Sequence, residues 1–209
     1  MISNQLYLRI FSSIIMLLIC FYLIIEGSIL FNIFLLICFF ISINEWSKFK
    51  IKKSFIIFGY LFLLLSFFSA FLLRSNYLGE GLFYVSLITT ICVSSDIGGF
   101  FAGKIFKGPK ITKISPNKTY SGVIGAYLMT IFLTYLFYEI NNKDNLFFSN
   151  FFSILIISTA SQIGDIIVSY FKRLSNIKDT GNIIPGHGGI LDRIDGMIFA
   201  FPLAFLIFL

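Results

Sequence analysis

The hydrophobic residues of this chain fall into long blocks, separated by short stretches that hold most of its lysines and arginines. Each block is about as long as a helix that crosses the hydrocarbon core of a bilayer. Because backbone N–H and C=O groups find no water inside lipid, we predict that these blocks are helices. The expected spans are residues 6–25, 28–43, 54–73, 82–103, 121–139, 146–171 and 190–209, seven in all.

The composition agrees with this pattern. Hydrophobic residues make up 57% of the 209 residues and charged residues only 12%, against about 25% charged residues in a typical soluble domain. So small a share of charge excludes a soluble globular protein. The three cysteines lie inside apolar blocks without paired spacing, so neither a disulfide framework nor a zinc site is expected. We therefore predict an all-α fold, a polytopic transmembrane helical bundle.

Lysine and arginine are distributed unevenly between the two sides of the predicted bundle. If the spans alternate in direction, Arg74 and Lys143 fall on one side and the other basic residues fall on the opposite side. Basic residues favour the cytoplasmic face, so the N-terminus is predicted to be cytoplasmic. We expect residues 1–80 to form a membrane scaffold and residues 81–209 to form a catalytic region with cytoplasmic loops.

One predicted span carries a stripe of polar side chains. Ser161, Asp165, Ser169 and Lys172 follow one another at spacings of four, four and three residues, so they share one face of a helix. A carboxylate within a span is unfavourable unless it faces a polar cavity or a cation. The stripe suits ligands of metal and phosphate, and it equally suits a hydrogen-bonded seam between helices. Spacing alone leaves both interpretations open.

A pair of carboxylates opens the last predicted span. Asp192 and Asp195 are three residues apart and are expected to share one helical face. Acidic residues at a helix N-terminus are also explained by the helix dipole and by capping. Together with Asp165 they would provide hard oxygen ligands for Mg²⁺, which binds through one or two carboxylates and substrate phosphates. The sequence has no set of His and Cys ligands, so a soft metal is not expected.

Two polar loops carry candidate contacts for phosphate. The loop between the last two spans is rich in glycine, which lets backbone N–H groups approach an anion, although most such loops are simple turns. His187 in this loop is the only histidine, and a single histidine more often orients a loop than it catalyses. The loop before residue 121 lacks the Walker A pattern. It offers three candidate contacts for a triphosphate ahead of a predicted helix: Ser115, Lys118 and Thr119.

The run of residues from Ser169 to Asp195 carries a resemblance. It reads Ser-x-Phe-Lys-Arg-x4-Lys-Asp-x-Gly-x2-Ile-Pro-x-His-Gly-Gly-Ile-x-Asp-Arg-Ile-Asp. At every fixed position it resembles the signature of the phosphatidate cytidylyltransferase family, the CDP-diacylglycerol synthases. Further segments that look like motifs of this family are residues 8–12, 45–46, 96–103, 114–119 and 162–165. Three residues depart from the family's usual loop: Asn117, Tyr120 and Ser121.

The resemblance implies an enzyme of phospholipid biosynthesis in the bacterial inner membrane, with its active site facing the cytoplasm. Such an enzyme transfers the cytidylyl group of CTP to phosphatidic acid and gives CDP-diacylglycerol and pyrophosphate. The implied cofactor is Mg²⁺, with a second cation left open. The implied partners are CTP, phosphatidic acid and membrane lipid, without nucleic acid, and the chain could form a homodimer.

The resemblance also implies roles for individual residues. The expected catalytic residues are Asp165, Lys172, Arg173, Lys178, Asp179, Asp192 and Arg193. The expected contacts to CTP and its phosphates are Ser115, Lys118, Thr119, Ser161, Ser169, His187, Gly188 and Gly189. The expected metal ligands are Asp165, Asp192 and Asp195. Because the phosphate of phosphatidic acid is already a nucleophile, catalysis is expected to depend on positioning and charge neutralisation.

Other classes of membrane protein fit the sequence less well. A CTP-dependent cytidylyltransferase that acts on an isoprenoid-linked lipid is disfavoured by the His-Gly-Gly and Asp-Arg-Ile-Asp segments. A CDP-alcohol phosphotransferase would need an Asp-Gly-x-x-Ala-Arg core, which the sequence lacks. An ion-coupled transporter could place Asp96 and Asp165 near glycine-rich breaks in its spans, but the sequence has no inverted repeat. A noncatalytic scaffold would not need these residues at all.

Overall fold

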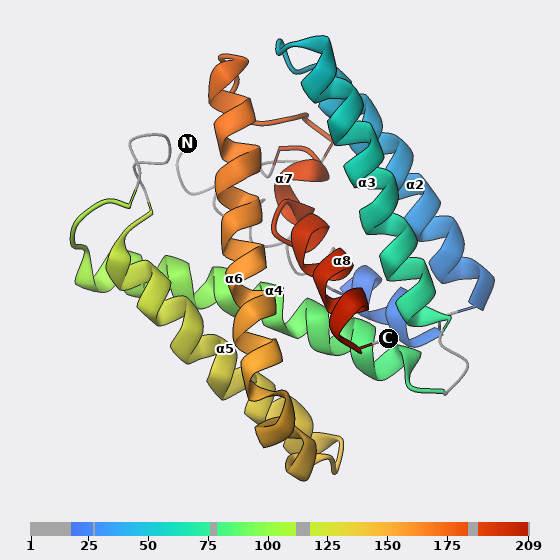
Figure 1. Ribbon diagram of the computed structural model, residues 1–209, viewed down its shortest axis with the longest axis vertical. Helices are drawn as coiled ribbons and strands as arrows, with labels where there is room; N and C mark the ends of the chain where they lie inside the picture. Colours follow the sequence, from blue (N-terminus) through green and yellow to red (C-terminus); the bar gives the residue numbers. More distant parts are fainter. Residues whose placement is uncertain (1–17, 27, 76–78, 112–117, 184–187, 209) are drawn as a thin grey trace. The chain divides into compact units, whose positions relative to one another are not determined.

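The computed structural model describes residues 18–26, 28–75, 79–111, 118–183 and 188–208. The described chain is all-α, with a single isolated bridge between Lys110 and Thr119 as its only β-type pairing. Residues 18–26 are helical. The helices that follow are α2 (Ser28–Ser47), α3 (Lys53–Arg74), α4 (Gly81–Phe106), α5 (Tyr120–Ile140), α6 (Asp144–Leu174), α7 (Leu191–Ile194) and α8 (Met197–Phe208) (Figure 1).

The protein is a multi-pass membrane protein. Five of the described helices are long and apolar enough to cross a bilayer, namely Ile29–Ser47, Lys53–Arg74, Gly81–Phe106, Tyr120–Ile140 and Asp144–Leu174. Large apolar side chains such as Phe58, Leu61 and Phe132 are exposed on these helices, as expected for surfaces that contact lipid. These five helices confirm the spans predicted from residue 28 to residue 171. The predicted span at residues 6–25 lies mostly outside the described residues.

The prediction that residues 190–209 form one helix is wrong. The chain turns at Asp195 and Gly196, between α7 and α8. Gly196 lies so close to the Ser161 side chain that a Cβ there would collide with it, so a tertiary contact accompanies the turn. With 12 residues, α8 is about 18 Å long, which is less than the roughly 30 Å of a hydrocarbon core.

The chain forms two compact units, which do not follow chain order. Met1–Leu82 and Phe171–Ile194 make up one unit, and Phe83–Tyr170 and Asp195–Leu209 make up the other. The glycine-rich loop after α6 packs with the N-terminal helices in the first unit. One such contact is the hydrogen bond from the Lys50 backbone N–H to the Ser175 hydroxyl, at 3.0 Å.

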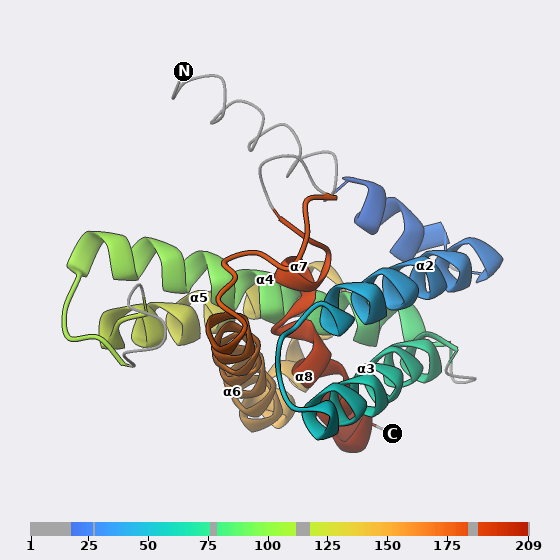
Figure 2. The ribbon, with the colours of Figure 1, turned by 90° about the horizontal axis from the view of Figure 1, so that it is seen from above.

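The first unit is built around the α2–α3 hairpin, whose two helices lie side by side in both ribbon views (Figures 1 and 2). Aromatic rings join the helices, with Phe39 and Phe67 5.5 Å apart between centroids. The indole of Trp46 occupies the space where a Cβ at Gly59 would stand, so this position requires glycine. Phe171 at the end of α6 packs on Trp46 at a centroid distance of 5.3 Å. Burial of these rings anchors the start of the glycine-rich loop.

The second unit contains α4, α5, most of α6, and α8. Helices α4 and α5 approach through glycines, since small residues let helices in membranes pack closely. A Cβ on Gly98 would stand 2.6 Å from the Cβ of Met129, and a Cβ on Gly122 would stand 3.0 Å from the carbonyl of Gly99. Helix α8 meets α6 where the Phe199 ring covers Gly164. Glycine at these positions therefore sets the helix spacing.

A chain of hydroxyl groups crosses the second unit. The Ser94 hydroxyl on α4 lies 3.3 Å from that of Thr130 on α5, which in turn lies 3.4 Å from that of Ser158 on α6. Tyr127 and Thr159 form a shorter contact of 2.8 Å between α5 and α6. Such contacts satisfy polar groups that would otherwise be unpaired within apolar surroundings.

Candidate active site

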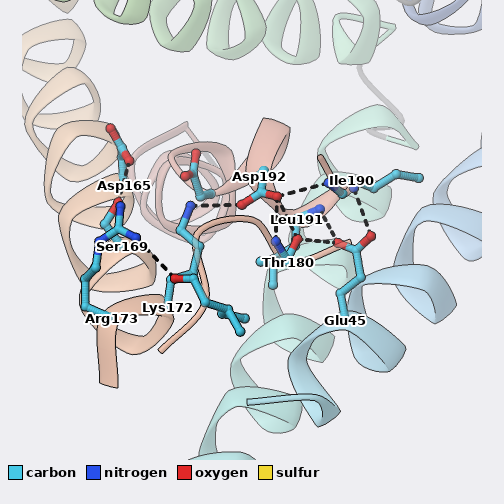
Figure 3. Close-up of polar contacts among 12 residues, drawn as sticks. Glu45, Asp165, Ser169, Lys172, Arg173, Thr180, Ile190, Leu191 and Asp192 are labelled. Atoms are coloured by element: carbon cyan, nitrogen blue, oxygen red, sulfur yellow. Dashed lines mark hydrogen bonds and ion pairs between the residues drawn. The ribbon is translucent and has the colours of Figure 1, made fainter. Parts of the chain in front are cut away.

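The carboxylate of Asp192 stands at the centre of a polar network in the first unit (Figure 3). The Lys172 ammonium donates to its Oδ1 at 2.9 Å. Its Oδ2 accepts hydrogen bonds from the backbone N–H groups of Thr180 at 2.7 Å and Gly189 at 3.0 Å, and it lies 3.0 Å from the Thr180 hydroxyl. The side chains of Asp192 and Lys172 are only 5% and 10% exposed. Both carboxylate oxygens are therefore held in fixed directions.

These contacts set the protonation state of Asp192. Burial alone would raise the pKa of its carboxyl group. The hydrogen bond from Lys172, the backbone donors Gly189 and Thr180, and the charge of Lys172 outweigh burial and hold the pKa below its ordinary value of 3.8. Asp192 is therefore an anion at neutral pH, as a ligand for a cation must be.

A second buried carboxylate supports this network from α2. Glu45 is 1% exposed, and its Oε2 accepts hydrogen bonds from the Thr180 hydroxyl and from the Leu191 N–H, each at 2.8 Å. Its Oε1 accepts one from the Ile190 N–H at 3.1 Å. Figure 3 shows Glu45 pointing from α2 toward this loop. Glu45 thus caps the N-terminal end of α7, where backbone N–H groups lack partners within the helix.

Glycines allow the loop to wrap around these two carboxylates. Gly188 has φ +87°, and a Cβ there would stand 2.6 Å from the Oδ2 of Asp192 and 3.1 Å from the Cβ of Asp179. A Cβ on Gly181 would stand 2.6 Å from the Oε1 of Glu45. Both positions are closed to side chains, so the glycines act here by close backbone approach.

Asp165 forms a separate cluster in the second unit. Its Oδ2 pairs with the Lys118 ammonium at 2.5 Å, and the Ser169 hydroxyl donates to its Oδ1 at 3.3 Å. The Lys118 and Asp165 side chains are 23% and 32% exposed, so solvent reaches this pair. Thr119, the next residue, is the N-cap of α5, and its hydroxyl accepts from the Gly122 N–H at 3.2 Å. The cap ties the backbone of Thr119, the neighbour of Lys118, to the start of α5.

The remaining predicted site residues have several kinds of environment. Ser161 is buried against Gly196, and the Oδ1 of Asp195 accepts from the Gly196 N–H at 3.0 Å. Arg173 donates to the Ile177 carbonyl at 3.2 Å. The following charged residues have exposed side chains: Arg173, Lys178, Asp179 and Arg193. Two predicted contacts lie outside the described residues: Ser115 and His187.

The donor atoms suit a hard cation. Carboxylate oxygens are the ligands that Mg²⁺ prefers, and Asp165 and Asp192 each pair with a lysine ammonium, which a cation at the same oxygen would have to displace. Within the described parts of the chain, no group of three or more His, Cys, Asp and Glu side chains gathers around a possible metal position. The carboxylates of Asp165 and Asp192 thus fit Mg²⁺ by ligand type, and the described side chains alone do not complete its coordination.

The sequence analysis assigned no site role to two members of the Asp192 network, Glu45 and Thr180. A signal for Glu45 was present, because it follows the predicted span at residues 28–43 in a segment, residues 45–46, that looks like a motif of the family. Thr180 gave no signal, because it occupies a variable position between Asp179 and Gly181 in the signature.

Comparison with known proteins places the chain in a family. The sequence profile described as "Cytidylyltransferase family" matches residues 48–209. The chain belongs to the cytidylyltransferase family. A phosphatidate cytidylyltransferase of Rickettsia bellii is 34% identical over 213 residues, covering 98% of this chain and 91% of the relative. A phosphatidate cytidylyltransferase of Rickettsia typhi is 35% identical over 219 residues, covering 97% and 92%. One from Haemophilus influenzae is 37% identical over 128 residues, covering 59% and 44%.

The extent of the cytidylyltransferase match bears on the two networks. It includes both aspartates, Asp165 and Asp192, and their lysine partners. Glu45 lies just before the matched residues, although it contacts the matched loop through Thr180 and Leu191. The Asp192 network therefore includes one residue, Glu45, that precedes the matched segment.

Proposed function

We propose that the protein is a phosphatidate cytidylyltransferase. A phosphate oxygen of phosphatidic acid attacks the α-phosphorus of CTP, the bond from that phosphorus to the bridging oxygen of the β-phosphate breaks, and pyrophosphate leaves. CDP-diacylglycerol is the product. The observation that carries the proposal is the buried pair of Lys172 and Asp192, two residues of the signature at residues 169–195, in a chain that is similar over nearly its whole length to enzymes of this name.

The chain's cationic residues have a direct role in this reaction. The substrates carry several negative charges, and negative charge moves to the departing pyrophosphate, so fixed positive groups lower the barrier. We assign this role to Lys172, Arg173, Lys178 and Arg193, and we assign contacts to CTP to Ser115, Lys118 and Thr119. The phosphate nucleophile needs no strong base, so positioning provides the remaining catalysis.

A divalent metal completes the proposal. We take its ligands from the sequence pattern as Asp165, Asp192 and Asp195, whose carboxylate oxygens suit Mg²⁺. When bound, Mg²⁺ neutralises phosphate charge. Lys172 and Lys118 then serve a second purpose, because each pairs with a carboxylate and orients it before substrate arrives. A homodimer stays a prediction of the resemblance.

The orientation in the membrane is also part of the proposal. The basic residues favour a cytoplasmic N-terminus and a site that faces the cytoplasm. Seven crossings follow if residues 6–25 form the first and if α7 and α8 together form the last. A broken helix can cross where protein covers the break, and Gly196 at this break packs on Ser161.

The proposal is tested by offering two lipid phosphates to purified protein with CTP and Mg²⁺. We expect mass spectrometry to detect CDP-diacylglycerol from phosphatidic acid and little product from a polyprenyl phosphate. Asp192→Asn and Asp165→Asn variants that remain folded at the assay temperature should form no product. Preference for the polyprenyl phosphate would overturn the proposed substrate, and product from folded Asp192→Asn would overturn the proposed site.

A further inference from the structure

Glu45 connects the N-terminal hairpin with the glycine-rich loop between α6 and α7 (the signature loop). It belongs to α2, yet its carboxylate accepts hydrogen bonds from Thr180, Ile190 and Leu191, which lie at least 135 positions later in the chain. It is almost completely buried, at 1% exposure. A buried carboxylate is retained only where several donors compensate its desolvation. The three donors meet this requirement and also fix the loop.

Thr180 links Glu45 to Asp192. The Thr180 hydroxyl lies 2.8 Å from the Oε2 of Glu45 and 3.0 Å from the Oδ2 of Asp192. Its single hydrogen can be donated to one of these oxygens at a time, while its N–H donates to Asp192 at 2.7 Å. Glu45 also holds the first N–H group of α7, the helix that carries Asp192. Through Thr180 and through the start of α7, Glu45 is thus linked twice to the Asp192 carboxylate.

We propose that Glu45 is a positioning residue for cytidylyl transfer, which sets the direction of the Asp192 carboxylate by holding Thr180 and the start of α7. The inference rests on the proposed function. Glu45 does not touch substrate in this account. It acts as the partners of metal-binding side chains commonly do, since loss of such a partner typically lowers metal affinity or activity by about 10–100-fold.

The chemistry requires a carboxylate at this position. Glu45 receives N–H donors on both of its oxygens, from Ile190 on Oε1 and from Leu191 on Oε2. In Glu45→Gln one oxygen becomes an NH₂ group, which would face one of these donors without accepting from it. The substitution keeps the size of the side chain, so it tests hydrogen bonding and not packing.

Ser42 offers a matched control. It lies about one turn before Glu45 on α2, is fully buried, and donates only to its own helix, at the Cys38 carbonyl with a distance of 2.7 Å. Ser42→Ala therefore removes a buried polar group from the same helix without touching the signature loop. Thr180→Ser, which keeps the hydroxyl, and Thr180→Val, which removes it, test the link itself.

The test measures Mn²⁺ binding to each purified, full-length variant by electron paramagnetic resonance, with CTP at a fixed concentration and without lipid. Thermal unfolding and the Mg²⁺ dependence of activity are measured alongside. We expect Glu45→Gln and Thr180→Val to weaken Mn²⁺ binding, and to raise the Mg²⁺ concentration for half-maximal activity, by about 10-fold. Saturating Mg²⁺ should restore part of the lost rate. Ser42→Ala and Thr180→Ser should bind Mn²⁺ like the wild type.

The outcomes separate this inference from the proposed function. Unchanged Mn²⁺ affinity in Glu45→Gln, or an activity loss that matches only its loss of folded protein, would overturn the positioning role. If Glu45→Gln does not fold, Thr180→Val decides in the same way. A wild type that binds Mn²⁺ but makes no CDP-diacylglycerol would instead overturn the proposed function, whatever the variants do.

Discussion

The ammonium nitrogen of Lys172, at the end of α6, lies 2.9 Å from the Oδ1 of Asp192 in α7. Both side chains are almost completely buried. Removal of one partner from a buried ion pair leaves an uncompensated charge. We expect Lys172→Met to abolish activity and to lower the free energy of unfolding by about 3 kcal/mol, measured by denaturation in detergent.

The double variant Lys172→Met/Asp192→Asn is the control for this prediction. It removes both charges, so it should be more stable than Lys172→Met while remaining inactive. Equal stability of Lys172→Met and the wild type would show that the pair is not buried as described.

The lowered pKa of Asp192 predicts how its contribution to stability depends on pH. A carboxyl group whose pKa is lower in the folded protein than in the unfolded chain stabilises the fold above its unfolded pKa. This contribution is lost as the pH falls through the folded pKa, below the ordinary value of 3.8. The difference in melting temperature between the wild type and Asp192→Asn should therefore stay constant from about pH 7 to pH 5 and shrink below about pH 4. Shrinkage already between pH 7 and pH 5 would mean that the pKa is raised.

Gly188 should be far less tolerant of substitution than another glycine with similar backbone geometry. Gly188 and Gly79 both have positive φ, at +87° and +76°, but a Cβ on Gly79 meets nothing within 4 Å. Each Gly→Ala change should cost about 1–2 kcal/mol for the left-handed backbone. Only Gly188→Ala should also lose activity, by more than about 10-fold, because its Cβ displaces Asp192. Equal activities of the two variants would contradict this reading of the loop.

Lys118 should contribute to CTP binding and have little effect on the stability of the fold. Its ion pair with Asp165 is partly exposed, and exposed pairs contribute at most about 1 kcal/mol. We expect Lys118→Gln to raise the KM for CTP several-fold while the melting temperature stays close to that of the wild type. Lys110→Gln is the control from the same loop, since the Lys110 backbone pairing with Thr119 survives the change. An unchanged KM for CTP in Lys118→Gln would show that Lys118 does not contact CTP.

The helices were predictable because a long apolar block in lipid satisfies its backbone hydrogen bonds within the block only as an α-helix. The expected spans at residues 54–73 and 121–139 lie within α3 and α5, since hydrophobicity decides both their existence and their approximate ends. The break at Asp195 and Gly196 was not predictable, because the adjoining Ser161 contact comes from another helix. The local pattern of hydrophobic and polar residues contains no information about such contacts between helices.

The site was predictable in its residue types but not in its pairings. The signature indicated Lys172 and Asp192 as functional residues, but no spacing rule joins residues 20 positions apart across a loop. Glu45 shows the same limit more strongly, because its partners lie far along the chain. The roles assigned to Asp165, Asp192 and Asp195 as metal ligands stay predictions.

Cytidylyl transfer is tested most directly by following the phosphates of CTP separately. Purified protein is incubated with phosphatidic acid, Mg²⁺ and CTP labelled at either the α- or the γ-phosphate, and the lipid extract is counted. Label from the α-phosphate should enter the lipid, and label from the γ-phosphate should appear in pyrophosphate. Label from the γ-phosphate in the lipid, or no label in the lipid from either position, would contradict the proposed reaction.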